Sequence, residues 1–195
     1  MTISPEYRRR LVVMVKEPRP GRVKTRLARD IGATTAAWWF RHQCAGLIRR
    51  LRDPRWQMIL AVSPDSEGMR SRTWPADLAR LPQGRGNLGE RMAGVFDAMP
   101  KGPVLIIGAD IPDIRKSHIA QAFRALGPCD AVFGPATDGG YWLVGLKRVR
   151  ARPPDLFAHV RWSSKHALAD SMASLPGYWI SLVDSLSDVD CADDL

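Results

Sequence analysis

Hydrophobic residues along the chain gather in short continuous runs, separated by longer stretches in which polar and apolar residues mix. The runs are rich in valine, isoleucine and leucine, and they lack the alternation typical of strands with one face in water. Such runs are typical of strands that are covered on both faces. They predict six strands, at residues 11–15, 58–62, 104–107, 131–133, 141–146 and 179–183.

Segments with helical spacing lie between these strands, at 34–51, 87–99, 117–126 and 163–175. In the second, Asn87 is followed three residues later by Glu90, the arrangement of a capping box. Its apolar stripe comprises Leu88, Met92, Val95, Phe96 and Met99. The first helix is expected to bury Trp38, Ala45, Ile48 and Leu51. Strands that alternate with helices predict an α/β sandwich with a mainly parallel sheet.

The length and composition are those of an ordinary globular protein with one domain. The chain has 195 residues, 45% of them hydrophobic and 25% charged, and no apolar run approaches the roughly 18 residues of a membrane helix. We expect a single domain over 1–195, without a secretory leader and located in the cytoplasm. Cys44, Cys129 and Cys191 are far apart and odd in number, so they indicate neither a disulfide framework nor a zinc site.

The formal net charge of +9 suits nucleic acid, an anionic membrane or small anionic ligands. Most arginines are scattered, and no basic helix carries interleaved aromatic residues. The pattern therefore favours phosphorylated small molecules over nucleic acid.

The densest basic stretch, KEPRPGRVKTRL at 16–27, directly follows the first strand. Its cations are Lys16, Arg19, Arg22, Lys24 and Arg26. Pro20 and Gly21 fix a tight path, and ligands of open α/β sheets bind beyond the carboxyl ends of the strands. The stretch is not a Walker A loop, because no glycine immediately precedes Lys24. Both a phosphate site and a solvated basic loop fit it.

Aspartates follow the strand at 104–107, in GADIPD. Asp110 or Asp113, leaving a buried strand, could hold Mg²⁺ or Mn²⁺, which prefer oxygen ligands. Either side chain could equally cap the following turn.

A glycine pair occurs in GPATDGGYW at 134–142. Gly139 and Gly140 would let the backbone approach a ligand, and Asp138 could act as a base or bind a hydroxyl. Tyr141 and its neighbour Trp142 alternate in direction, so one is expected in the core and one toward a cleft. A turn that simply enters a strand explains the stretch equally well.

The segment 84–89 matches the GxGxxG pattern and opens a helix. The preceding ADLARLPQ at 76–83 is a poor strand, so we do not favour a dinucleotide site.

Five stretches in this order carry a resemblance: KEPRPGRVKTRL, GNLGERM, GADIPD, DGGYWLVGL and DVDCADDL. They resemble the DUF2064 family of nucleotide-diphospho-sugar transferase-like proteins. The resemblance implies a GT-A-like three-layer α/β sandwich in which Lys16, Lys24 and Arg26 lie on a nucleotide-binding loop. It also implies that Asp110 is a metal ligand and Asp190 a second one. The chain departs from the pattern at Asn87, where aspartate is common, and at 191–192, where Thr-Pro is typical.

The resemblance and the motifs together predict a transferase that depends on Mg²⁺ or Mn²⁺. Its expected partners are a nucleotide or nucleotide sugar and a small acceptor, with no nucleic acid and no membrane span. We expect glycosyl transfer from a nucleoside-diphosphate sugar, with Asp138 as the catalytic base and Asp113, Gly139, Gly140 and Tyr141 lining the substrate cleft. The alternatives are a nucleotidyltransferase that joins a nucleoside triphosphate to a phosphorylated molecule, and a non-catalytic nucleotide-binding protein.

Overall fold

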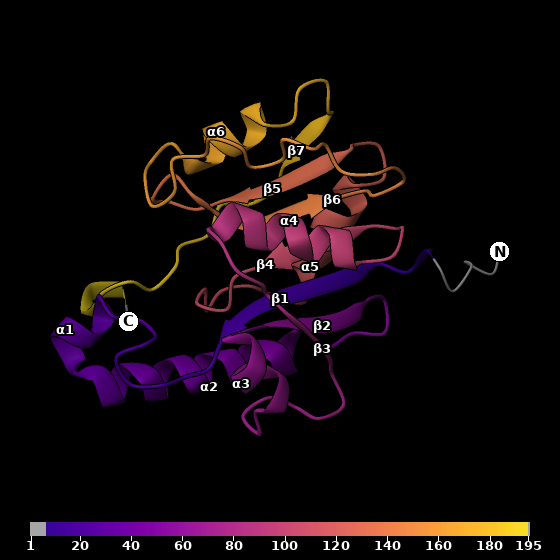
Figure 1. The fold of residues 1–195 in the computed structure, drawn as a ribbon. Coiled ribbons are helices and arrows are strands. Elements are labelled where there is room, and N and C mark those ends of the chain that lie inside the picture. The colour runs from indigo at the N-terminus through magenta and orange to yellow at the C-terminus, as the bar shows by residue number, and fades with distance from the viewer. Residues whose placement is uncertain (1–6, 195) are drawn as a thin grey trace.

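A single mixed sheet organises the chain. The computed structural model describes residues 7–194, so residues 1–6 and Leu195 of the predicted domain lie outside the described residues. The strands are β1 (Arg10–Lys16), β2 (Gln57–Ser63), β3 (Ala79–Pro82), β4 (Val104–Ile107), β5 (Ala131–Pro135), β6 (Tyr141–Leu146) and β7 (Ile180–Leu182). They lie in the order β3-β2-β1-β4-β6-β5-β7 (Figure 1).

The sheet is mainly parallel, as predicted. β1 runs parallel to both β2 and β4, with Val12 paired to Ile59 on one side and to Ile106 on the other. Only β6 runs against its neighbours β4 and β5 among the described strands, and β7 is parallel to β5. The carboxyl ends of β1, β4 and β5 therefore meet at one edge of the sheet.

Helices cover both faces. The helices are α1 (Leu27–Ile31), α2 (Ala33–Leu51), α3 (Asp65–Arg70), α4 (Leu88–Ala98), α5 (Lys116–Ala125) and α6 (Ala167–Ala173), followed by a 3₁₀ turn at Ala192–Asp194. Residues of α2 and α5 pack in one apolar cluster with Val13, and residues of α4 and α6 pack in another with Val12. Adjacent strand residues point to opposite faces, so continuous apolar runs feed both clusters and build a three-layer sandwich. Among the described residues, no helix is both long and apolar enough to span a membrane.

The stripe predicted for α2 is partly wrong. Trp38 is 62% exposed and Ala45 is also exposed, whereas Ile48 and Leu51 are buried as expected. The buried face instead comprises Ala36, Ala37, Phe40, Cys44, Leu47, Ile48 and Leu51. The helix turns this way because Phe40 and Leu47 bring more apolar surface to the sheet than Ala45 can. In α4, Leu88 is exposed and the other four members of its predicted stripe are buried.

The prediction that 76–83 is a poor strand is also wrong, since it contains β3. Arg80 interrupts the apolar pattern, but its guanidinium donates to the carbonyls of Gly68, Ser71 and Trp74 at 3.2, 2.8 and 2.8 Å. The polar side chain thus ties an edge strand to the preceding loop, a role that periodicity does not reveal.

The glycines of 84–89 have structural reasons that do not involve a dinucleotide. At Gly86 a side chain would meet the Glu90 carboxylate, which accepts from the Asn87 amide at 2.7 Å in the predicted capping box. At Gly89 it would lie 2.7 Å from both Phe157 and Trp162. Helix capping and close packing therefore account for this part of the motif.

Candidate functional site

An ion-pair cluster lies at the carboxyl edge of the sheet, between the basic loop, the end of β4 and the C-terminal segment. The Lys24 ammonium donates to Asp110 Oδ2 at 2.7 Å and to Asp190 Oδ1 at 3.3 Å. Arg26 Nη1 donates to Asp190 Oδ2 at 2.7 Å. The fold thus brings together two predicted metal ligands and two cations of the predicted nucleotide loop.

The C-terminal segment reaches this cluster by following β5 and then crossing to α1 (Figure 1). The Leu186 amide donates to the Pro135 carbonyl at 3.1 Å, and the Val189 amide to the Asp110 carbonyl at 3.3 Å. Val189 is buried against Leu27 of α1, beside which the Ala192 amide donates to Asp30. These contacts fix the backbone on both sides of Asp190.

Asp188 is a member of the cluster that the sequence analysis missed. Its pKa is raised, first by burial and then by the charges of Asp190 and Asp110, with Asp138 adding to the effect and Lys24 opposing it. The signal was present in the DVD triplet, because residues two apart in an extended segment point to the same side. Asp188 shows that the site holds more negative charge than the two predicted ligands provide.

Lys24 offsets part of this negative charge. Its side chain is only 7% exposed, against 33% for Asp110 and 39% for Asp190. Burial alone would lower the pKa of Lys24, but the charges of Asp110 and Asp190 and their hydrogen bonds outweigh it and raise the pKa. Lys24 is therefore held as a cation between the two carboxylates.

The same geometry tests whether a divalent ion fits. Within the described residues, no three His, Cys, Asp or Glu side chains lie close enough together to hold one metal ion. Asp110 and Asp190 nevertheless converge on one positive charge, and Mg²⁺ usually takes one or two carboxylates together with water and substrate phosphates. The donor set suits an ion that is completed by a phosphorylated substrate.

The cations of the basic stretch 16–27 form two groups, those in ion pairs and those without an acidic partner among the described residues. Lys24 and Arg26 pair with the aspartates and Arg19 pairs with Glu67 at 3.2 Å, whereas Lys16 and Arg22 are exposed and form no ion pair within residues 7–194. Pro20 and Gly21 make an exposed turn, with Gly21 at a φ of 75°.

The loop also holds successive backbone amides that lack a hydrogen-bond acceptor. The amides of 23–26 donate to no acceptor in the described part of the chain. Successive free amides beside cations are a common anion-binding arrangement.

The glycine pair serves the packing of a neighbouring segment. Gly139 has a φ of 89°, and a side chain there would lie 2.5 Å from the backbone of Lys165. The Gly140 amide donates to Asp138 Oδ1 at 2.8 Å, which orients that carboxylate. The pair therefore positions Asp138 and seats the segment before α6.

Tyr141 and Asp113 take no part in the described ion pairs around Lys24. The Tyr141 ring packs edge-on against Phe133, and its hydroxyl accepts from Ser171 Oγ at 3.2 Å. Burial raises the pKa of Tyr141 well above its usual value, against the opposing effect of the Ser171 hydrogen bond. Trp142 packs in the opposite apolar cluster. Asp113 is exposed and its carboxylate has no partner among the described residues.

The fold is that of the nucleotide-diphospho-sugar transferase-like proteins, as comparison with solved structures shows. A provisionally named nucleotide-diphospho-sugar transferase from Desulfovibrio desulfuricans superposes with a TM-score of 0.80 and 27% identity, over 95% of this chain and 83% of that one. The chain belongs to the family described as an uncharacterized protein conserved in bacteria (DUF2064), whose model matches residues 47–164. No curated protein matches the chain.

Two more distant structures share the fold. Rv0371c of Mycobacterium tuberculosis, solved in complex with manganese, has a TM-score of 0.53 and 16% identity, over 96% of this chain and 95% of that one. The 4-diphosphocytidyl-2C-methyl-D-erythritol synthase of Anaerococcus prevotii has a TM-score of 0.59 and 9% identity, over 97% and 95%.

Proposed function

We propose that this chain is a divalent-metal-dependent transferase that transfers a glycosyl group from a nucleoside-diphosphate sugar to a small acceptor. The observation that carries the proposal is the meeting of Asp110 and Asp190 at Lys24 and Arg26, beside a loop with free backbone amides. The similarity to a provisionally named nucleotide-diphospho-sugar transferase supports the choice of donor.

The residues would divide the work as follows. The amides of 23–26, with Lys16 and Arg22, would bind the diphosphate, because guanidinium, ammonium and amide groups suit phosphate oxygens. Asp110 and Asp190 would hold Mg²⁺ or Mn²⁺, and the ion would stabilise the charge that develops on the departing phosphate. The manganese complex of Rv0371c supports this choice of metal.

Asp138 would act as the base. It would take the proton from the acceptor hydroxyl while the bond from the sugar to the acceptor oxygen forms and the bond to the diphosphate breaks. Its orientation by the Gly140 amide and its place among the carboxylates that perturb Asp188 support this role. The exposed Asp113 would lie at the rim, and the half-buried Tyr141, whose ring packs against Phe133, would shape the cleft from behind.

A second candidate is nucleotidyl transfer, in which a phosphorylated substrate attacks a nucleoside triphosphate and pyrophosphate leaves. One observation favours it: similar folds include a CMP-2-keto-3-deoxy-manno-octonic acid synthetase in complex with CTP, with a TM-score of 0.55 and 12% identity over 95% of this chain and 94% of that one. Both reactions use the same cleft, so the leaving group must distinguish them.

The test is to incubate the protein and Mn²⁺ with each nucleotide sugar, and separately with each nucleoside triphosphate plus a pool of sugar phosphates. Asp110→Asn serves as the blank. Asp155→Asn is the matched control, because Asp155 is exposed and its carboxylate has no partner within residues 7–194. Metal-dependent release of nucleoside diphosphate, absent from the blank and kept by the control, supports glycosyl transfer. Pyrophosphate release that requires a sugar phosphate would support the second candidate instead, and equal activity in the blank would contradict both.

The same proposal places the chain in the cytoplasm and assigns it small-molecule partners. Cys44, Cys129 and Cys191 are all free thiols, which suits a reducing compartment.

A further inference from the structure

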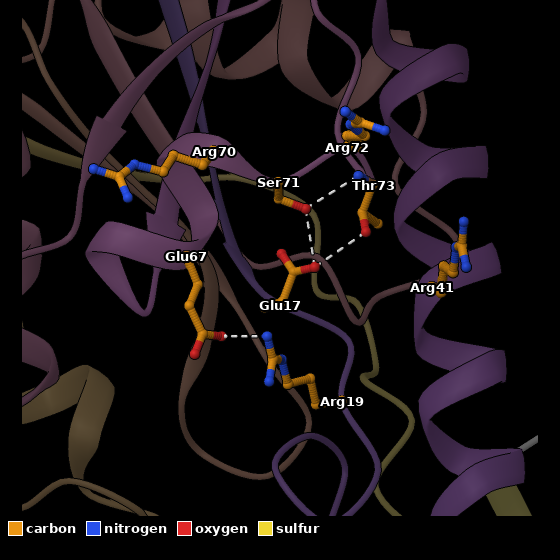
Figure 2. Close-up of a pocket in the computed structure, with 8 residues that line it drawn as sticks. All are labelled: Glu17, Arg19, Arg41, Glu67, Arg70, Ser71, Arg72 and Thr73. Carbon is orange, nitrogen blue, oxygen red and sulfur yellow. Dashed lines mark hydrogen bonds and ion pairs between the residues drawn. The ribbon is translucent and has the colours of Figure 1, made fainter.

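A hollow of about 300 Å³ opens beside the basic loop, between α2, α3 and the segment that follows α3 (Figure 2). None of the ion pairs at Asp110 and Asp190 involves its lining. The lining residues, which we call the Glu17 groove, are Glu17, Arg19, Arg41, Glu67, Arg70, Ser71, Arg72 and Thr73.

Glu17, the residue directly after β1, lies at the centre of this groove. Its Oε1 accepts hydrogen bonds from Ser71 Oγ at 2.9 Å and Thr73 Oγ1 at 3.1 Å. Its Oε2 is buried and has no hydrogen-bond partner among the described residues. Leaving a buried carboxylate oxygen without a donor is costly, so a hydroxyl or amine that reached this oxygen would satisfy it.

The rim of the groove is positive. Arg41, Arg70 and Arg72 are exposed and have no acidic partner within residues 7–194, while Arg19 is paired with Glu67. Four arginines against two glutamates leave a net charge of +2 on the lining (4 − 2). Figure 2 shows Arg41 and Arg72 on the same side of Glu17 as Thr73. Guanidinium groups of this kind match phosphate oxygens in geometry and charge.

We propose that the Glu17 groove binds a small phosphorylated molecule that also carries hydroxyl groups. Arg41 and Arg72 bind its phosphate, with Arg70 adding charge, and one of its hydroxyls donates to Glu17 Oε2. A dianionic phosphate balances the net charge of the lining, and the hydroxyl completes the hydrogen bonding of the buried carboxylate. The proposal concerns binding and stands whether or not the transferase proposal holds.

The test is titration calorimetry of the metal-free chain with glucose 1-phosphate, inorganic phosphate and glucose. The wild type should bind glucose 1-phosphate saturably and more tightly than inorganic phosphate, and glucose weakly. The double variant Arg41→Gln, Arg72→Gln should lose at least about tenfold in affinity for both phosphates. In Glu17→Gln the amide nitrogen replaces the unpaired acceptor, so the preference for glucose 1-phosphate should fall while inorganic phosphate binds at least as tightly.

Two controls separate this groove from general charge and from the basic loop. Arg49→Gln with Arg124→Gln removes the same charge from exposed side chains that have no described partner, and should keep the affinity. Lys16→Ala with Arg22→Ala, which alters the proposed nucleotide loop, should also keep the binding of glucose 1-phosphate. No saturable binding by the wild type, an equal loss in the charge control, or a loss that follows the loop variant instead would each overturn the proposal.

Discussion

Replacement of Lys24 by methionine removes the ammonium group that separates Asp110 from Asp190 and keeps a stem of similar length. Lys24 is 7% exposed and donates to the two carboxylates at 2.7 and 3.3 Å, so the variant leaves both without their shared cation. Arg26 still pairs with Asp190, but the Arg26 side chain is 66% exposed. We therefore expect the unpaired carboxylate of Asp110 to account for most of the lost stability.

The magnitude follows from the burial of the partners. Breaking a fully buried ion pair by removing one member costs about 3–5 kcal/mol. Asp110 and Asp190 are 33% and 39% exposed, so water would solvate the freed carboxylates and reduce the cost. A loss of roughly 1–2 kcal/mol in the free energy of unfolding remains, or roughly 2–8 °C in Tm for a chain of this size.

The assay is thermal unfolding with and without Mn²⁺. If the ion binds between the freed carboxylates, Mn²⁺ should raise the Tm of Lys24→Met by more than it raises that of the wild type, because the ion no longer competes with an ammonium group. The double variant with Asp110→Asn should lose this extra gain. Arg22→Met is the matched control, since Arg22 is exposed and makes no described side-chain contact, and its Tm should hardly move. A Lys24→Met protein as stable as the wild type, or one indifferent to Mn²⁺, would refute the reasoning.

Three further variants test other parts of the structure. The pKa of Asp188 is raised, so its charged form lowers the stability of the folded state. This loss of stability is complete above the pKa of the folded state and absent below the pKa of the unfolded state. Asp188→Asn should therefore raise the Tm at pH 7, and the gain should shrink at acidic pH, whereas a constant gain would exclude the charge explanation. Asn87→Ala removes the cap that accepts from the Glu90 amide at 3.0 Å and should cost about 1 kcal/mol in guanidinium unfolding; a loss below a few tenths would show that the cap is dispensable. Gly139→Ala combines a φ of 89° with a contact of 2.5 Å to the Lys165 backbone, so it should lower the Tm strongly, while Gly46→Ala, which has open space, should not.

The strands were predictable because burial on both faces requires continuous runs of apolar residues. The longer helices were predictable because their apolar residues recur at helical spacing. The cap at Asn87 was predictable for a similar reason, since both partners lie within one helical turn. β3 was missed because Arg80 stabilises it through carbonyls of another segment, which no local pattern encodes. The orientation of α2 was misjudged because Trp38 looks like a core residue and yet lies in water.

The candidate site shows the same division. Asp110 could be singled out because it directly follows a buried strand, and Asp190 because of the family resemblance. The pairing of both with Lys24 joins residues 86 and 166 positions apart, so it depends on the tertiary fold alone. The Glu17 groove was not foreseen, since Ser71 and Thr73 have no signature that links them to a glutamate 54 and 56 residues earlier.

The contact between Lys24 and Asp190 also has a consequence for the order in which the chain folds. Closing a loop of 166 residues costs conformational entropy that a single contact cannot offset, so the sheet must already have formed when Lys24 meets Asp190. The parallel core of β1, β2 and β4 can form before the C-terminal segment docks. Docking of that segment should then be a late step, and also among the first contacts to open when the native state fluctuates. Hydrogen exchange at the Val189 amide would follow this step separately from the exchange of the sheet.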